Sequence, residues 1–380
     1  MNPPRISPTS TMGSHLFPLA AVLWGAVACA QAPSPPAAAR VDSLLDAVVA
    51  EHGIPGLAVA VVRSDTVLVA EARGVRRAGR PERVEVADPF HLGSVSKPIT
   101  ATMLGALVEE GVLRWDTTVG EAFVGDEVHP ALLDVTLVML LQHRAGIAPF
   151  EQDEEWAVVD PPLVGLPLAR RQAFAAWLLR QPPGAPPGTE HVYSNGGYTV
   201  AAAMAERATG QAWEVLVRER VFEALGMATA GFGWPARSHP DAPWGHEWEG
   251  DETVPQDPHG DYQLEALAIG PAGDIHASVL DLARFGQAHL RGLLGQADLL
   301  APATVRRLHD APVGEYALGW NVRSFGDHHL GSAGTFFATV IVSPEDDLVY
   351  AFVTNVNADA GLPSALISGL RRIFVGPPSQ

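Results

Sequence analysis

Lysine is almost absent from this sequence. Its 380 residues contain 25 lysines and arginines together, and Lys97 is the only lysine among them. Cysteine is as scarce, since Cys29 is the only one, which excludes an intrachain disulfide framework and a thiolate metal site. The formal net charge is −18 and no run of basic residues occurs. We therefore expect no nucleic-acid partner.

Long apolar runs are also missing, so we expect no membrane span. The longest such stretch, HLFPLAAVLWGAVACA at 15–30, is short and is followed by a Pro/Ala-rich linker at 31–40. We predict that residues 1–30 are a secretion signal that is removed before folding. Its positive flank is weak, because only Arg5 precedes the apolar stretch.

The end of this signal allows two outcomes. Cleavage after Ala30 would release a soluble protein, whereas cleavage before Cys29 would leave that cysteine for lipid attachment, since GAVAC resembles a bacterial lipobox. Translation could start at Met1 or at Met12. In either case we expect an exported protein, periplasmic or secreted, with a lipid anchor at Cys29 in the second outcome.

Stretches rich in β-branched residues predict two hairpins near the ends of the chain, 56–62 with 66–72 and 338–344 with 348–355. Helical periodicity occurs over residues 41–52, 167–181, 198–210, 279–292 and 363–374.

These patterns predict an α+β fold in one catalytic domain at 41–375. An antiparallel sheet formed by both termini would be flanked by helices, with a mainly helical subdomain inserted at about 116–290. Residues 236–262 show no clear period, and we expect a long loop there.

Lys97 follows Ser94 by three residues in HLGSVSKPITATMLGALVEEG. The apolar residues that follow predict a helix, which would place both side chains on one face of its first turn. A guanidinium stays protonated, whereas a buried amine can lose its proton and act as the base that a serine nucleophile needs. The alternative is a lysine retained by chance on a solvated helix face.

Two further motifs follow in order. HVYSNGGY places Tyr193 and Asn195 before a predicted helix, and HLGSAGTFF places His329 and Gly331 at the start of a predicted strand. With Ser-x-x-Lys, these motifs resemble the serine β-lactamase and penicillin-binding-protein superfamily. The resemblance covers residues 41–357 and is closest to the class C β-lactamase-related branch, which includes esterases and D-amino-acid peptidases.

The resemblance implies a role for each matching residue. Ser94 would be the acylated nucleophile, and Lys97 and Tyr193 would share the role of base. Their ordinary pKa values are both about 10, so each would need the other or a low-dielectric site. Asn195 would hold the substrate amide and Lys97, and the backbone N–H groups of Ser94 and Ser332 would form an oxyanion hole. We expect Lys97 at the mouth of the cleft.

His329 departs from the pattern of efficient β-lactamases in this superfamily, which usually carry lysine there. In those enzymes the fixed positive charge of the lysine meets the ligand carboxylate, whereas a histidine is neutral for much of the time near neutral pH. The resemblance is therefore closer to esterase-like and peptidase-like members. His329, Gly331 and Ser332 are assigned to substrate binding. Alternatively, His329 begins a strand and bonds a backbone carbonyl.

Other histidines are given structural or minor roles. His143 is expected to form hydrogen bonds beneath the site. The segment 236–262 contains residues that could bind a divalent ion, but they lack the His-Glu-x-x-His spacing of a metal site. These residues are His239, His246, Glu247, Asp251 and His259. The sequence implies no metal and no cofactor.

Together these features predict an exported serine hydrolase that acts through an acyl-enzyme. Its substrate would be a small-molecule or peptide acyl compound: a short acyl ester, a D-amino-acid peptide or a β-lactam. We expect an esterase or D-peptidase rather than an efficient β-lactamase. A second hypothesis is a penicillin-binding or sensing module on the same fold, acylated slowly or not at all. The presence of Ser94, Lys97 and Tyr193 together argues against this second hypothesis. A third hypothesis is metal-dependent hydrolysis.

Overall fold

The computed structural model describes residues 35–151, 153–159, 163–260, 268–296, 298–323, 326–332, 334–358 and 361–376. The expected secretion signal and Cys29 lie outside these residues. Among the residues that are described, no helix is both long enough and apolar enough to cross a membrane.

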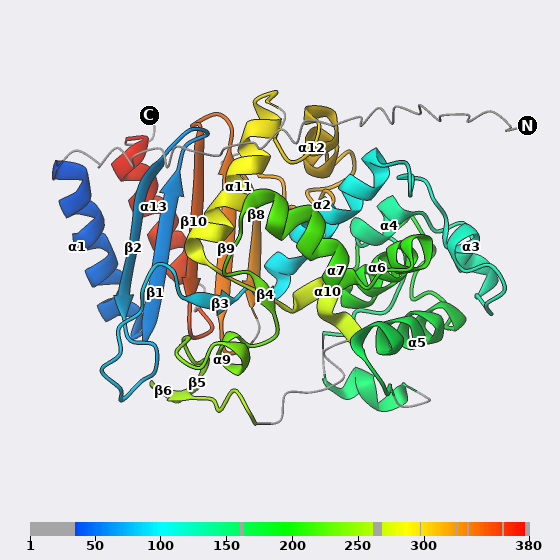
Figure 1. The fold of residues 1–380 in the computed structure, drawn as a ribbon, viewed down its shortest axis with the longest axis horizontal. Helices are drawn as coiled ribbons and strands as arrows, with labels where there is room; N and C mark the ends of the chain where they lie inside the picture. The colour runs from blue at the N-terminus through cyan, green and yellow to red at the C-terminus, as the bar shows by residue number, and fades with distance from the viewer. Residues whose placement is uncertain are drawn as a thin grey trace, which may run out of the picture.

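The two ends of the chain form a five-stranded antiparallel sheet in the order β2-β1-β10-β9-β8 (Figure 1). Both predicted hairpins are confirmed, because β1 pairs with β2 and β9 pairs with β10. β1 and β10 join the two hairpins, which confirms a sheet built from both termini. The strands are β1 (Gly56–Val62), β2 (Val67–Gly74), β8 (Asp327–Ser332), β9 (Phe337–Ser343) and β10 (Leu348–Thr354).

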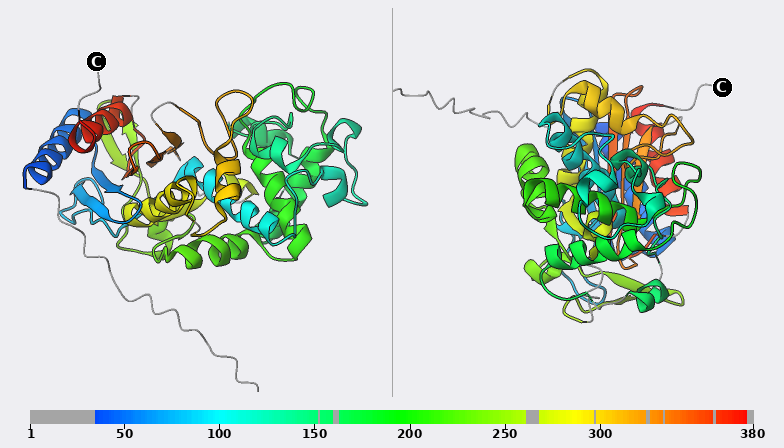
Figure 2. Two further views of the ribbon diagram at one scale, coloured as in Figure 1. Left: turned by 90° about the horizontal axis from the view of Figure 1, so that it is seen from above. Right: turned by 90° about the vertical axis from the view of Figure 1, so that its right-hand side faces the viewer.

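Helices cover both faces of this sheet (Figure 2). α1 (Pro35–His52) and α13 (Gly361–Phe374) pack together on one face, and α11 (Val279–Leu293) packs on the other. Alternate side chains of a strand point to opposite faces, so β1 is buried along its whole length. Leu57, Val59 and Val61 belong to the α1/α13 core, whereas Ala58, Ala60 and Val62 belong to the core beneath α11.

α1 begins earlier than its periodicity predicts. The pattern indicates a helix over 41–52, but the helix starts at Pro35, so residues 35–40 of the expected linker are helical. Proline is tolerated in the first turn of a helix, where backbone N–H groups have no helical partner. Ala37, Ala38 and Ala39 follow it, and alanine has the highest helix propensity.

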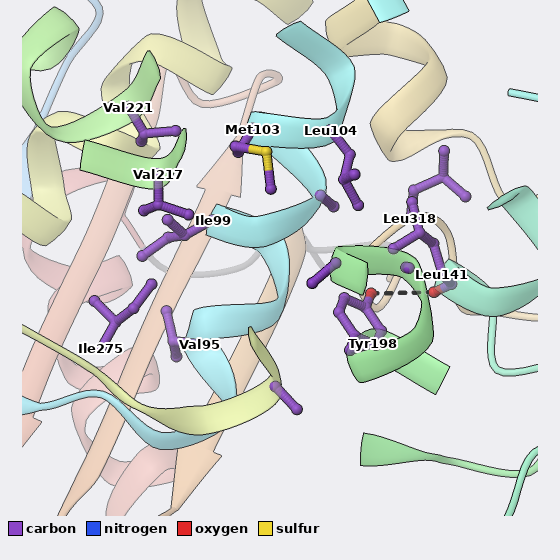
Figure 3. Packing of buried hydrophobic residues seen from close by; sticks show 14 of the residues in the cluster. Val95, Ile99, Met103, Leu104, Leu141, Tyr198, Val217, Val221, Ile275 and Leu318 are labelled. Atoms are coloured by element: carbon purple, nitrogen blue, oxygen red, sulfur yellow. Dashed lines mark hydrogen bonds between the residues drawn. The ribbon is translucent and has the colours of Figure 1, made fainter. Parts of the chain in front are cut away.

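The residues between the hairpins are mainly helical, as predicted. α2 (Ser96–Glu109) passes through the middle of the molecule, and nearly all of its residues up to Leu107 are buried. Figure 3 shows Val217 and Val221 on one side of this helix and Leu318 on another. Because α2 is packed on all sides, its apolar residues are not confined to one stripe.

Most of the other elements are short, apart from α5 and α6. The helices are α3 (Val119–Ala122), α4 (Leu137–Leu141), α5 (Pro167–Arg180), α6 (Asn195–Thr209), α7 (Trp213–Val217), α8 (Glu223–Leu225), α9 (Pro235–Ser238), α10 (Gly270–Gly273) and α12 (Pro302–His309). A small sheet in the order β3-β7-β4 contains β3 (Pro89–His91), β7 (Ile275–Ser278) and β4 (Gly231–Phe232).

The prediction of a structureless loop over 236–262 is wrong in part. This segment contains most of α9 and a hairpin of β5 (His246–Glu249) and β6 (Glu252–Pro255), whose turn holds Gly250 at a φ of 66°. Three of the four residues of β5 are exposed. The strands therefore lack the apolar alternation by which a half-buried strand is recognised.

The edge strand β8 packs closely against the turn before α2. Gly331 has no room for a side chain, because a Cβ there would lie 2.1 Å from Leu92 O and 2.8 Å from Ser94 N. Only glycine lets one backbone approach another this closely. This contact sets the position of β8 beside Ser94.

Gly331→Ala should therefore destabilise the protein by about 1–3 kcal/mol, the usual range for overpacking. Chemical denaturation would measure the loss. Gly184→Ala is the matched control, because a Cβ there would meet only Gly146 O, at 3.9 Å. If the two variants were equally stable, the close packing of β8 would not contribute to stability.

Candidate active site

Ser94 lies in a short 3-10 helix, Gly93–Val95, that leads directly into α2. Gly93 has a φ of 51°, in the left-handed region that favours glycine. Ser96 Oγ donates to Gly93 O at 2.7 Å and accepts a hydrogen bond from Ile275 N at 3.0 Å. The turn is thereby fixed to β7, while Ser94 itself is only half-buried. The backbone of Ser94 is thus held in place, while the residue stays partly exposed.

Lys97 is fully buried in the first turn of α2. Its Nζ lies 3.0 Å from Ser94 Oγ, 2.7 Å from Asn195 Oδ1 and 2.9 Å from Ala272 O. Burial lowers the pKa of Lys97 well below its ordinary value, and the charge of Glu151 opposes this shift only in part. The alternative of a lysine on a solvated helix face is wrong. So is the expectation of a side chain at the cleft mouth.

The partners of Lys97 define the protonation state that fits best. Asn195 Nδ2 donates to Phe150 O at 2.9 Å, which turns Oδ1 toward Lys97. Oδ1 and the carbonyl of Ala272 can only accept hydrogen bonds. A neutral amine would use its two hydrogens on these oxygens and direct its lone pair at the hydroxyl of Ser94. This is the arrangement of a general base beside its nucleophile.

Tyr193 is the second hydrogen-bond partner of the Ser94 hydroxyl. Its Oη donates to Ser94 Oγ at 2.7 Å, and its ring centroid lies 4.4 Å from Lys97 Nζ. Burial raises the pKa of Tyr193, although the hydrogen bond to Ser94 acts in the opposite direction. The phenol therefore stays protonated in this state, and Ser94 Oγ can accept from Tyr193 while it donates to Lys97.

Tyr193 and Asn195 are positioned by the start of α6. Ser194 is the N-cap of this helix, and its Oγ accepts a hydrogen bond from Gly197 N at 2.9 Å. His143 Nδ1 accepts from Ser194 N at 3.0 Å, and its ring lies 4.4 Å from the ring of Tyr193. The prediction that His143 is a structural hydrogen-bonding residue beneath the site is confirmed.

β8 brings the third motif to the same place. The packing of Gly331 against Leu92 O and Ser94 N puts this strand next to the nucleophile. The side chains of His329 and Ser332 lie outside the described residues. Substrate binding by His329, and an oxyanion hole made by the N–H groups of Ser94 and Ser332, therefore stay predictions.

The histidines of the segment 236–262 do not form one cluster. His246 Nε2 accepts from Ala78 N at 2.9 Å, and its Nδ1 bonds Asn355 O at 2.8 Å. These two bonds tie β5 to the loop after β2 and to the end of β10. Within the part of the chain that the structure describes, no three histidine, cysteine, aspartate or glutamate side chains are arranged to hold a metal ion.

Sequence reasoning missed two members of the site. The carbonyl of Ala272 lies in PAGDIHASVLDLARF, a stretch that resembles the family, but every residue carries a carbonyl, so none is marked by its type. His91 Nδ1 accepts from Gly93 N at 3.3 Å, next to the nucleophile. The sequence signal that could have identified His91 is its position two residues before Gly93, where its side chain can reach the backbone of the turn.

Comparisons with known proteins show which family the chain resembles. The model of the Beta-lactamase family matches residues 41–366. Penicillin-binding protein 4 of Amycolatopsis lactamdurans is 28% identical over 358 residues, covering 87% of each chain. Esterase EstB of Burkholderia gladioli is 33% identical over 206 residues, or 51% of each chain.

The solved structure "Crystal structure of SurE" superimposes with a TM-score of 0.73 at 25% identity, over 90% of this chain and 78% of that chain. The resemblance inferred from the motifs is therefore confirmed. Since the family match spans most of the sequence and the same fold is found, this chain belongs to the Beta-lactamase family of serine hydrolases.

Proposed function

We propose that this protein is an exported hydrolase that forms an acyl-enzyme at Ser94 and acts on an ester or amide. The observation that supports this most strongly is the buried amine of Lys97, 3.0 Å from Ser94 Oγ. A buried amine without a carboxylate hydrogen-bonded to it is unfavourable as a cation and suitable as a base.

In the proposed acylation step, Ser94 Oγ attacks the acyl carbon and its proton passes to Lys97 Nζ. The bond from the acyl carbon to the leaving group then breaks, and Tyr193 Oη gives its proton to the leaving group. Lys97 afterwards restores the proton of Tyr193. In deacylation a water molecule adds to the acyl carbon, its proton returns through the same groups, and Ser94 is regenerated.

The opposite pKa shifts refine the shared base role that the family resemblance implies. Burial disfavours the ammonium form of Lys97 and the phenolate form of Tyr193, so both groups are favoured in their neutral forms. A neutral amine accepts a proton, and a neutral phenol gives one. Two groups whose pKa values are pushed in opposite directions commonly divide the roles of base and acid. We assign the base to Lys97 and the acid to Tyr193.

The substrate class follows from the third motif and from the relatives. His329 stands where a permanent cation would meet the carboxylate of a β-lactam, which favours substrates without that carboxylate. One relative is an esterase by its printed description and another is a penicillin-binding protein. We infer that an acyl ester fits better than a cephalosporin, and the family resemblance gives a D-amino-acid peptide as the other expected substrate.

Slow acylation by penicillin is the second candidate function. It is favoured by the similarity to penicillin-binding protein 4, which extends over most of both chains. The hydrogen-bonded arrangement of Ser94, Lys97 and Tyr193 instead favours turnover.

Export is proposed from the apolar stretch at 15–30. Cys29 would carry a lipid if cleavage occurs before it, and the mature chain would begin after Ala30 in the other case. Mass spectrometry of the mature N-terminus distinguishes the two.

A fluorophosphonate probe should label the wild-type protein at Ser94 and nowhere else. The expectation follows from the paired contacts of Oγ with Lys97 and Tyr193, which activate this hydroxyl. Peptide mapping by mass spectrometry locates the adduct, and Ser94→Ala should not be labelled. An adduct on another serine, or labelling that persists in Ser94→Ala, would refute the mechanism.

Lys97→Ala should lower kcat/KM by about 10²- to 10⁴-fold, the usual contribution of a general base. Methylamine should restore part of the activity by occupying the vacated space. Because burial lowers the pKa of Lys97, its neutral form persists to lower pH than that of an exposed lysine. The wild-type rate should fall on acidification as Lys97 gains a proton, and the rescued rate should follow the titration of the added amine.

Trimethylamine is the control for this rescue, because it has no N–H to donate to Asn195 Oδ1 and Ala272 O. Equal rescue by trimethylamine, or an active Lys97→Ala variant without added amine, would show that Lys97 is not the base.

Short-chain p-nitrophenyl esters should be hydrolysed with a higher kcat/KM than nitrocefin, because histidine replaces a fixed cation at 329. His329→Lys should narrow this difference by improving nitrocefin turnover. Efficient cephalosporin turnover by the unaltered protein would show that position 329 does not decide the substrate class.

A further inference from the structure

The turn that carries Ser94 is bonded to a histidine outside the three motifs. His91, the last residue of β3, is almost fully buried, and its Nδ1 lies 3.3 Å from Gly93 N. A backbone N–H can only donate, so Nδ1 must accept and carries no proton. The proton of the neutral ring is therefore on Nε2.

The second ring nitrogen of His91 approaches α10, the short helix that also contacts Lys97. Its Nε2 lies 3.5 Å from Asp274 Oδ1, and Asp274 is the C-cap of α10. The carbonyl of Ala272 in the same short helix accepts from Lys97 Nζ. A Cβ on Gly273 would lie 4.0 Å from Gly93 C, so the end of α10 lies against the nucleophile turn.

The surroundings of His91 are mainly uncharged. His276 of β7 is paired with His91 in the small sheet. The Nδ1 of His276 must donate to the carbonyl of Gly233, 2.8 Å away. Burial lowers the pKa of His276 to about 4, so this ring is neutral near neutral pH. Phe336 lies with its ring centroid 6.2 Å from that of His91. Asp274 is the carboxylate that faces His91 in this group.

We propose that His91 is a positioning residue of the active site, which holds the turn of Ser94 through its hydrogen bond with Gly93 N and so keeps Ser94 Oγ within reach of Lys97 Nζ. The proposal rests on the proposed function. An apolar ring of similar size would fill the same space beside Phe336, but it would leave Gly93 N without this acceptor. The hydrogen bond, rather than the volume, therefore distinguishes a positioning role from core packing.

Three substitutions separate these contributions. In His91→Asn the amide oxygen replaces Nδ1 and can accept from Gly93 N. His91→Gln places its amide near the former Nε2, toward Asp274, and His91→Phe removes both contacts while keeping a ring. We expect kcat for ester hydrolysis to fall about 100-fold in the Phe and Gln variants, as for a small misplacement of reacting groups. KM should change little, and the Asn variant should stay within about tenfold of wild type.

His129→Phe is the matched control, because His129 Nδ1 accepts from Ala131 N at the same 3.3 Å and with the same spacing, at a half-buried position. Its kcat should equal that of wild type. Fluorophosphonate labelling and ester turnover of the wild-type protein test the proposed function. If the wild-type protein is labelled at Ser94 but does not hydrolyse esters, the His91 variants are compared by their rates of Ser94 labelling instead of by kcat.

Thermal melts of each variant separate misfolding from mispositioning, and His91→Gln keeps the test decisive if His91→Phe does not fold. Rescue by Asn but not by Gln, at similar melting temperatures, supports the proposal. It is overturned if Phe or Gln at 91 leaves kcat unchanged, or if folded Asn and Gln variants lose activity equally.

Discussion

The amine of Lys97 is buried among the hydroxyl of Ser94, the side-chain oxygen of Asn195 and the carbonyl of Ala272. Removing an amine from water is unfavourable unless it is well bonded or becomes neutral. Its three partners come from the turn before α2, from α6 and from α10, so these elements must converge on one point. The dense packing around α2 is thus a condition for the chemistry as well as a source of stability.

Arg171 is a second buried basic side chain, and its surroundings keep it charged. Arg171 is fully buried, and its guanidinium is bonded to the carboxylates of Glu206 and Glu214, which favour the charged form. The hydrogen-bond partners of Lys97 among the described residues are neutral oxygen atoms. The two sites therefore have opposite effects on a proton: one retains it and the other releases it. This difference explains why an arginine-rich sequence keeps a lysine at position 97.

Much of this could be predicted from the sequence. The β-branched residues of the two hairpins predict strands of the sheet, and the spacing of Ser94 and Lys97 predicts that their side chains lie together. The hairpin within 236–262 could not be predicted, since strands of mixed polarity carry no periodic signal. The burial of Lys97 was also missed, because burial depends on α6 and α10, which are distant in sequence. A helix packed on all sides gives no stripe from which its environment could be inferred.

This burial changes what a substitution at position 97 can show. At a cleft mouth, arginine would keep the charge and lose only proton transfer, so the two roles could be separated. In a fully enclosed space, the larger guanidinium would also disturb Asn195 and the end of α10. Ser94 is half-buried whereas Lys97 is not exposed at all. In the proposed mechanism the base therefore acts from behind Ser94, where water does not restore the ammonium form.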